Sequence, residues 1–347
     1  MQQHFASDNN AGMCPEALAA LIEANAEPHT PAYGDDPWTI RARAAVRDLL
    51  AAPHAMVHFV FNGTAANAIV LAHLCRPYNA ILAHASSHIA TDEAGAPGYF
   101  TGGASLRTAD GAHGKLTPAD IDRLTAGGRG VHSTRPRVVS ITQATERGTV
   151  YTPNELADLA AAARRMDLLV HMDGARLANA VAHLGCSAAD VTWRAGIDVL
   201  CLGGVKNGLG AGEALVIFDE ELGAEIEWRI KQAGHLNSKM RLVTAPWARL
   251  IETGAWHANA RHANAMAARL ARHVGKIEGL AIVAPVEANA VFVEIPVGVQ
   301  RAVRERGWRF YTFAGETVCR LMCAWDTTAE TVDRFAGDLR DEFVRSG

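Results

Sequence analysis

The sequence has no closely paired cysteines, no long apolar run and no excess of positive charge. Its 347 residues include six cysteines without a CxxC pair, which in a chain of this size is typical of reduced thiols. No stretch approaches the roughly 18 apolar residues of a membrane span, and the start, MQQHFASDNN, is unlike a signal peptide. A formal net charge of -4 argues against a nucleic-acid surface. We therefore expect a cytoplasmic protein that binds neither membranes nor nucleic acid.

Short apolar segments alternate with alanine-rich amphipathic segments through the middle of the chain. The latter predict helices at 64–75 and 152–166, the second with Thr152 as N-cap, Pro153 at its first position and Glu155 at its third. The apolar segments predict strands at 56–61, 80–84, 137–142, 167–172 and 197–202. This alternation indicates an α/β fold with a mostly parallel sheet covered on both faces. Ligands of such sheets gather at the carboxyl ends of the strands.

The pattern changes after about residue 246, where a smaller α+β domain is expected. We divide the chain into an N-terminal arm (1–30), a large domain (31–245) and a small C-terminal domain (246–347). The arm holds a possible short helix at 15–25. In the small domain we expect one long helix at 245–274, strands at 280–286, 290–296, 308–313 and 319–325, and a last helix at 330–344.

An acid and a lysine follow two of the expected strands. Asp173 could simply cap a helix that begins at Gly174, and Lys206 could be a solvated residue of its glycine-rich turn, 203–212. Together they point to pyridoxal phosphate, which is held by a lysine Schiff base while an Asp keeps its pyridine nitrogen protonated. The glycines would let the backbone approach a flat ligand closely. The turn lacks the GxxxxGK[ST] order of a Walker loop.

A phosphate site is expected where the strand at 56–61 leads into the next helix. Gly63 allows close approach, and Thr64 adds a hydroxyl to the amides of the helix start. The alternative is a plain turn in which Thr64 is the N-cap.

Other candidates are two histidines, an arginine and a tyrosine. His84 and His88 have metal-like spacing, but no third ligand is evident, so we expect no metal and interpret His88 as a ring that stacks on the cofactor. His132 is a second acid–base candidate. Arg320 interrupts an apolar run and needs an anion, either a structural carboxylate or that of a substrate. Tyr33 lies in a polar turn.

These segments resemble the L-threonine aldolases. The resemblance rests on SDN, YGDD, FNGTAAN, SSHIATDEAGAP, HMDGARLANA and GGVKNG, and it continues through WRFYTF and CRLMCAWD near the end. It is closest to the bacterial low-specificity L-threonine aldolases and the phenylserine aldolases. It implies a pyridoxal-phosphate enzyme of the aspartate-aminotransferase fold (fold type I), with a large cofactor-binding domain and a small C-terminal domain.

The resemblance also implies roles for individual residues. The cofactor would be bound by Lys206 through a Schiff base, Asp173 at the ring nitrogen, Arg176 near the phenolic oxygen, Gly63 and Thr64 at the phosphate, and His88 on the ring face. The substrate would meet Ser7 and Arg320 at its carboxylate, His132 near its β-hydroxyl, and Tyr33 from a neighbouring subunit. The family forms tetramers, as dimers of dimers with shared active sites. Here Val205 and LNSKMRLVT depart from the family pattern, so a phosphate contact from Lys239 or Arg241 of a partner stays open.

The implied reaction is aldol cleavage of an L-β-hydroxy-α-amino acid, such as L-threonine, L-allo-threonine or L-phenylserine, to glycine and an aldehyde. The alternative on the same scaffold is a β-eliminating lyase or an aminotransferase. The general base is left open between His88, His132 and a bound water. The sequence does not fix the preferred β-substituent or the threo/erythro selectivity.

Overall fold

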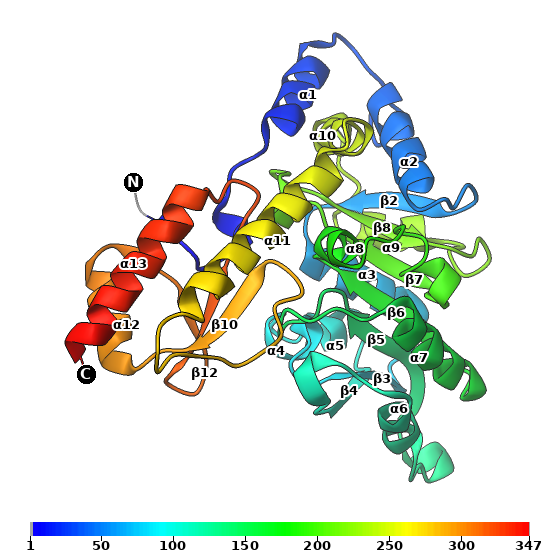
Figure 1. Ribbon diagram of the computed structural model, residues 1–347. Coiled ribbons are helices and arrows are strands. Elements are labelled where there is room, and N and C mark those ends of the chain that lie inside the picture. The colour runs from blue at the N-terminus through cyan, green and yellow to red at the C-terminus, as the bar shows by residue number, and fades with distance from the viewer. Residues whose placement is uncertain (1–2, 347) are drawn as a thin grey trace.

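The computed structural model describes residues 3–346, and its central element is a seven-stranded sheet with helices on both faces (Figure 1). The strands in spatial order are β2 (Met56–Val60), β8 (Glu213–Ile217), β7 (Val199–Leu202), β6 (Leu169–Gly174), β5 (Arg135–Thr142), β3 (Asn79–His84) and β4 (Ser105–Ala109). All neighbours pair in parallel except β8, which runs antiparallel to both β2 and β7. The predicted mostly parallel sheet is therefore confirmed.

The near-continuous apolar character of the strands follows from burial on both faces. Successive side chains of a strand point to opposite faces, so Val138 packs in the core beneath α3 (Gly63–Leu74) and Val139 in the core beneath α7 (Pro153–Arg165). The other helices around this sheet are α4 (His88–Thr91), α5 (Ala96–Phe100), α6 (Pro118–Thr125), α8 (Leu177–Leu184) and α9 (Ile226–Gln232).

Helix α7 begins as its sequence predicts. The Thr152 hydroxyl accepts a hydrogen bond from the Glu155 amide at 3.2 Å, and the Glu155 carboxylate accepts one from the Thr152 amide at 2.7 Å. This reciprocal cap satisfies two amides that have no partner inside the helix.

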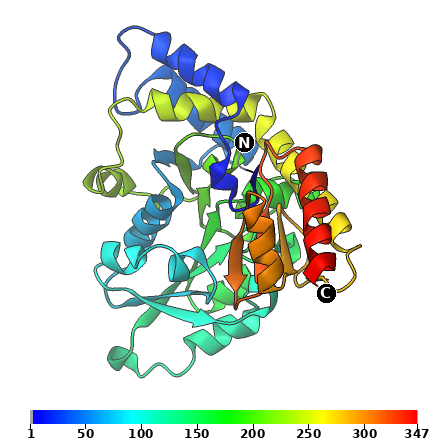
Figure 2. The same cartoon turned by 90° about the vertical axis from the view of Figure 1, so that its left-hand side faces the viewer.

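The small domain is an antiparallel sheet with helices on it, seen to the left of Figure 1. Its strands in spatial order are β12 (Tyr311–Ala314), β13 (Val318–Met322), β10 (Ala290–Glu294) and β9 (Ala281–Ile282). Its helices are α11 (Ala255–Val274), α12 (Val297–Glu305) and α13 (Ala329–Ser346). The N-terminal strand β1 (Gln3–His4) pairs with β11 (Trp308–Arg309), so the start of the chain lies against this domain (Figure 2).

Three expectations for the C-terminal half were wrong in detail. The single helix expected at 245–274 is two helices, α10 (Arg241–Glu252) and α11, because Gly254 takes a left-handed conformation with φ of 76° between them. The strand expected at 308–313 is divided into β11 and β12, and that expected at 280–286 shrinks to β9.

The hydrophobic cores divide within α11, and not at residue 246. Ala255, Trp256 and Ala260 belong to the large core, whereas Ala267 and Leu270 belong to that of the small domain. The arm helix α1 (Pro15–Ala26) and the next helix, α2 (Pro37–Leu49), both pack on α10 at the top of Figure 1.

Two further sequence features can be compared with the structure. All six cysteines lie within residues 3–346, and none of them is in a disulfide. Between residues 3 and 346, no helix combines the length and the apolar character that crossing a membrane requires.

Candidate active site

Several strand ends meet around one cavity of about 260 Å³ at the carboxyl edge of the parallel strands. Because β8 runs antiparallel, its first residue, Glu213, lies at the same edge. The cavity is lined by Asn9, Phe61, Asn62, Gly63, Thr64, Asn67, His88, Glu146, Asp173, Ala175, Val205, Lys206, Gly210, Ala211 and Glu213. The fold thus brings five of the predicted site residues together: Gly63, Thr64, His88, Asp173 and Lys206.

Asp173 lies near the end of β6, paired in register with Thr142 and Cys201. Its side chain is 6% exposed; Oδ1 accepts a hydrogen bond from the Ala175 amide and Oδ2 one from Asn67 Nδ2, each at 3.0 Å. Helix α8 begins only at residue 177, so Asp173 is not the cap of a helix that starts at Gly174. Its carboxylate is free to face a cationic ring nitrogen in the cavity.

Lys206 lies in a short 3-10 helix, Val205–Asn207, directly after β7. The glycines before it serve a different purpose from the predicted one. A Cβ at Gly203 would lie 2.4 Å from the Ala175 carbonyl oxygen, and one at Gly204 would lie 2.5 Å from the Trp247 ring. Close packing of the protein against itself, not approach to a ligand, therefore requires glycine at these two positions.

Glu213 holds this turn from the neighbouring strand. Its Oε2 accepts hydrogen bonds from the amides of Gly204 at 2.5 Å and Val205 at 3.4 Å. Burial raises the pKa of Glu213 to about 7, although the two amides and the Lys206 charge act against the shift. One feature of the sequence could have indicated this residue, an acid at the start of an otherwise apolar strand.

The start of α3 provides an open anion site. Asn62 is the N-cap, because its side chain accepts a hydrogen bond from the Ala65 amide at 2.9 Å; the interpretation of Thr64 as N-cap was wrong. No atom of the described residues lies within 4 Å of a Cβ built at Gly63. The amides of Gly63 and Thr64 belong to the first turn, where no intrahelical acceptor exists, so they can bind a phosphate.

His88 is the first residue of α4. Its Nδ1 lies 2.8 Å from Glu93 Oε1, and this hydrogen bond raises the pKa of His88 against the opposing effect of burial. His84 instead bonds the Gly111 carbonyl and Ser86. In the described chain, the group with metal-binding geometry is His88, Glu93 and Asp173, whose ligand atoms lie within 4.8 Å of one another.

Arg176 is committed to a carboxylate that the sequence did not indicate. Its Nε and Nη2 donate to Asp8 Oδ2 and Oδ1 at 2.7 and 2.9 Å, and Asn289 Nδ2 donates to Asp8 Oδ2 at 3.0 Å. Burial alone would raise the pKa of Asp8, but the charge and hydrogen bonds of Arg176 lower it to about 2. Arg176 can reach a cofactor only with its remaining N–H groups.

Arg320, on β13, has no carboxylate partner among residues 3–346. Its Nη2 donates to the Ala6 carbonyl at 3.3 Å, and its buried Nε has no hydrogen-bond partner in the described structure. Ser7, which follows Ala6 in the chain, accepts a hydrogen bond from the Asn9 amide through its side chain at 3.2 Å. Arg320 and Ser7 therefore lie close together, with donors available for an anion.

Two predicted site residues lie elsewhere. His132 is exposed and precedes the start of β5, whereas Asp173 pairs with Thr142 at the far end of that strand. A strand of this length spans roughly 25 Å, so His132 does not belong to this site, and the prediction of a role near the β-hydroxyl was wrong. Tyr33 is 50% exposed and lines a neighbouring cavity of about 550 Å³ with Lys231.

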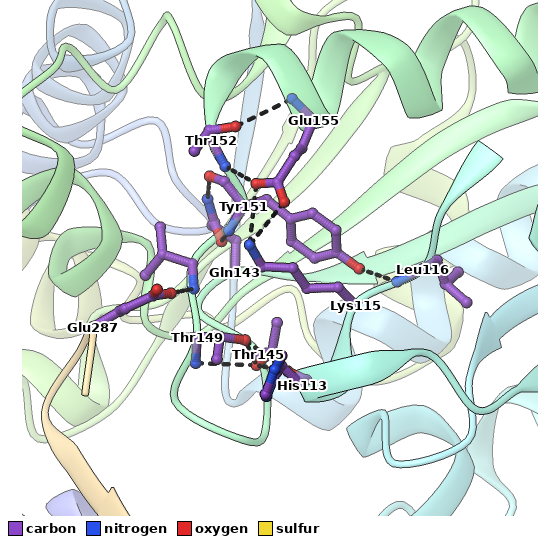
Figure 3. Close-up of polar contacts among 11 residues, drawn as sticks. His113, Lys115, Leu116, Gln143, Thr145, Thr149, Tyr151, Thr152, Glu155 and Glu287 are labelled. Atoms are coloured by element: carbon purple, nitrogen blue, oxygen red, sulfur yellow. Dashed lines mark hydrogen bonds and ion pairs between the residues drawn. The ribbon is translucent and has the colours of Figure 1, made fainter. Parts of the chain in front are cut away.

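Glu146 is a further carboxylate of the 260 Å³ cavity, and the sequence did not indicate it. Its turn is fixed on both sides: the Gln143 side chain exchanges two hydrogen bonds with the Tyr151 backbone, and the hydroxyls of Thr145 and Thr149 lie 2.7 Å apart (Figure 3). Nearby Lys115 pairs with the Glu155 carboxylate. The bonds of Gln143, Thr145 and Thr149 fix the turn that contains Glu146, but no local motif indicates this residue.

The donors and acceptors of this cavity fit pyridoxal phosphate. A buried carboxylate lies near a lysine, the helix start beside them is open, and Asn67 Oδ1 is buried without a partner among residues 3–346. Lys206 and Asp173 would hold the cofactor at its aldehyde carbon and ring nitrogen, with Gly63 and Thr64 at the phosphate. Such an arrangement can stabilise negative charge on an amino-acid substrate.

Comparisons with known proteins agree with this geometry. Residues 4–297 match the family model described as beta-eliminating lyase. The chain is 48% identical, over 97% of both chains, to low-specificity L-threonine aldolases of Pseudomonas aeruginosa and of a further Pseudomonas strain. A structure of Leishmania major threonine aldolase superposes with a TM-score of 0.92 at 30% identity and covers 98% of this chain and 99% of that one. The resemblance seen in the sequence is confirmed.

Proposed function

This chain belongs to the beta-eliminating lyase family and groups with the low-specificity L-threonine aldolases, and on that premise we propose that it is a pyridoxal-phosphate-dependent carbon–carbon lyase. It would cleave L-β-hydroxy-α-amino acids between Cα and Cβ, which gives glycine and an aldehyde. The observation that carries the proposal is the cavity shared by Asp173, Lys206 and the open start of α3.

The residues around the cavity divide the work of cofactor binding. Bound pyridoxal phosphate supplies an electron sink for the bond that breaks at Cα. Lys206 would hold the cofactor at its aldehyde carbon. Asp173 would keep a proton on the ring nitrogen, and its low exposure of 6% strengthens that charge interaction. The amides of Gly63 and Thr64 would bind the phosphate.

Arg320 and Ser7 would bind the substrate carboxylate. The free Nε of Arg320 supports this role, because a buried guanidinium N–H needs an acceptor. Fixing the carboxylate also fixes rotation about the bonds to Cα, so these residues select Cα–Cβ as the bond to be broken. His88 would then accept the β-hydroxyl proton as the aldehyde departs. Its Nδ1 is engaged by Glu93, which leaves Nε2 as the proton acceptor.

L-Threonine and L-allo-threonine are the proposed substrates, with L-phenylserine as a further candidate. The names of the Pseudomonas relatives, low-specificity L-threonine aldolase, support a site that tolerates both configurations at Cβ. They support the L configuration at Cα in the same way.

We also infer a homotetramer, a dimer of dimers with shared sites, located in the cytoplasm. Tyr33 supports the shared site: it is half-exposed and lies outside its own chain's site cavity, so any role in catalysis must be in a partner's site. Arg241 Nε is already bonded to the Ala24 carbonyl, whereas Lys239 is exposed, which favours Lys239 as the cross-subunit phosphate ligand. The unpaired cysteines support a reducing compartment.

The test is release of glycine from L-threonine, L-allo-threonine and L-phenylserine with pyridoxal phosphate supplied. We expect glycine and the matching aldehyde in equal amounts, and a Lys206→Ala variant that neither cleaves substrate nor forms the lysine-bound visible absorbance. Keto acid or ammonia in place of glycine would show a β-eliminating lyase or an aminotransferase. Purified wild type that takes up no cofactor would overturn the proposal.

A further inference from the structure

Resting on the proposed function, we propose that Asn67 and Glu93 are positioning residues that hold Asp173 and His88 together as one hydrogen-bonded unit. Asp173 and His88 are the groups assigned to the nitrogen and the face of the cofactor ring. They come from different elements, β6 and α4, and do not bond each other directly. A link through the protein would fix both relative to the ring.

Asn67 provides that link from the buried side of α3. Its Nδ2 donates to Glu93 Oε1 at 2.8 Å and to Asp173 Oδ2 at 3.0 Å. An amide nitrogen carries two hydrogens, so one amide serves both carboxylates. The orientation of the amide is not ambiguous, because ionised carboxylates only accept hydrogen bonds and the oxygen end of Asn67 could bond neither.

Glu93 extends the link to His88. The same oxygen, Oε1, accepts from Asn67 and lies 2.8 Å from His88 Nδ1. A carboxylate at this distance fixes the His88 proton on Nδ1 and leaves Nε2 as an acceptor. The Nε2 atom lies 3.7 Å from the carboxylate of Asp92, which is 85% exposed and therefore weakly coupled to it.

The burial of this unit argues against a purely structural role. The Glu93 side chain is fully buried, Asn67 is 1% exposed, and Glu93 Oε2 and Asn67 Oδ1 have no hydrogen-bond partner in the described structure. A buried carboxylate with an unpartnered oxygen is costly, and apolar side chains would pack the same space at lower cost. Orientation of Asp173 and His88 explains why polar groups are kept here.

The charges around His88 make its titration a direct readout of the link. Glu93 raises the pKa of His88 through the hydrogen bond, burial lowers it, Asp173 and Glu146 raise it, and Lys206 lowers it. Glu93→Gln removes the largest favourable effect, so the pKa should fall. Asn67→Ala removes the donor that competes with His88 for Glu93 Oε1, so the pKa should rise.

The experiment measures the His88 pKa by ring-carbon NMR in histidine-labelled holoenzyme, with the signal assigned by its loss in His88→Gln. Equilibrium titration with pyridoxal phosphate gives cofactor affinity in parallel. Asn67→Ala should also weaken cofactor binding about 10-fold, because the Asp173 carboxylate loses the hydrogen bond that the Asn67 amide donates to it. The matched control is Asn79→Ala, a buried asparagine at the amino end of β3 that bonds the Arg135 carbonyl; it should change neither quantity.

A His88 pKa that falls in Glu93→Gln and rises in Asn67→Ala would establish the link. A general loss of packing would not shift the pKa in opposite directions in the two variants. A His88 pKa that is unchanged or lowered in Asn67→Ala would overturn it. If Asn67→Ala does not fold, Glu93→Gln preserves the side-chain shape, and an unchanged His88 pKa in that variant overturns the proposal equally. Wild type without bound cofactor would defeat the proposed function instead, whereas loaded variants that titrate like wild type defeat this inference alone.

Discussion

Asp8 and Arg176 form a buried, bidentate ion pair between residues 168 positions apart, with N···O distances of 2.7 and 2.9 Å. The pair fixes the N-terminal segment, and with it Ser7, against the end of β6. The position of Ser7, which we propose to bind the substrate carboxylate, therefore depends on the ion pair between Asp8 and Arg176.

Asp8→Asn should destabilise the protein by about 3–5 kcal/mol, because it leaves the Arg176 guanidinium buried without a counter-charge. Urea unfolding measures the change. The matched control is Asp333→Asn, since Arg269 and Asp333 also form two hydrogen bonds, both of 2.6 Å, but at the surface. The urea midpoint of this variant should hardly differ from that of wild type. Equal shifts in the two variants would show that burial of the Asp8 pair contributes nothing.

The same pair predicts acid sensitivity. The pKa of Asp8 is about 2 in the folded protein, against an ordinary value of 3.8 for an aspartate, so its contribution to stability is present above pH 3.8 and is lost as pH falls through about 2. Wild type should therefore lose stability more steeply in this range than Asp8→Asn. Parallel pH curves of the free energy of unfolding would contradict the assignment.

Glu213 predicts the opposite dependence on pH. Its pKa is raised from 4.5 to about 7, so its contribution to stability is fully present below pH 4.5 and is lost as pH rises through about 7. The glutamine of Glu213→Gln stays neutral. The free energy of unfolding of this variant, relative to wild type, should therefore rise by about 1–3 kcal/mol between pH 5 and pH 8.5. Unfolding is best followed after removal of the cofactor, whose own titration would add to the curve. A pH-independent difference would show that Glu213 does not ionise there.

The elements of the fold that sequence predicts well are those specified locally. The segment 56–61 became β2 (Met56–Val60), and the cap of α7 forms between residues three positions apart. The break at Gly254 was missed because helix-compatible residues stand on both sides of it. A glycine inside such a pattern does not reveal whether its backbone is helical or left-handed.

The placement of Asp173 and Lys206 in one cavity was predictable, because both follow strands whose carboxyl ends meet at the same edge of the sheet. Asp8 and Glu93 were not, because their partners are set by tertiary contacts: Asp8 meets Arg176 across the chain, and Glu93 meets Asn67 from another element. His132 shows the converse error: it precedes β5, so the parallel sheet places it at the amino end of that strand, away from the carboxyl edge where the cavity lies.

Arg320→Ala should raise KM about 10- to 100-fold, since the substrate carboxylate loses charged hydrogen bonds. Control of the reaction should weaken too, because a loosely held carboxylate no longer fixes which bond to Cα breaks. Steady-state kinetics with product analysis for glycine, keto acid and ammonia measures both effects. Arg309→Ala, at an exposed arginine of the same domain, is the control. Unchanged KM in Arg320→Ala would remove the carboxylate assignment.

His88 and Glu146 are the titratable side chains of the cavity that remain as proton acceptors once Lys206, Asp173 and Glu213 have been assigned. The Glu93 hydrogen bond fixes the proton of His88 on Nδ1, so we expect His88 to be the base and Glu146 to act on it through charge.

His88→Gln should lower kcat by about 10²–10⁴-fold. Glu146→Gln should keep most activity but move the acid limb of the pH–rate profile to lower pH, because losing its charge lowers the pKa of His88. In wild type that limb should lie above the ordinary pKa of histidine, with activity lost as His88 takes up a proton. A larger loss of kcat in Glu146→Gln than in His88→Gln would reverse the two roles, and comparable small losses in both would assign the proton to a bound water.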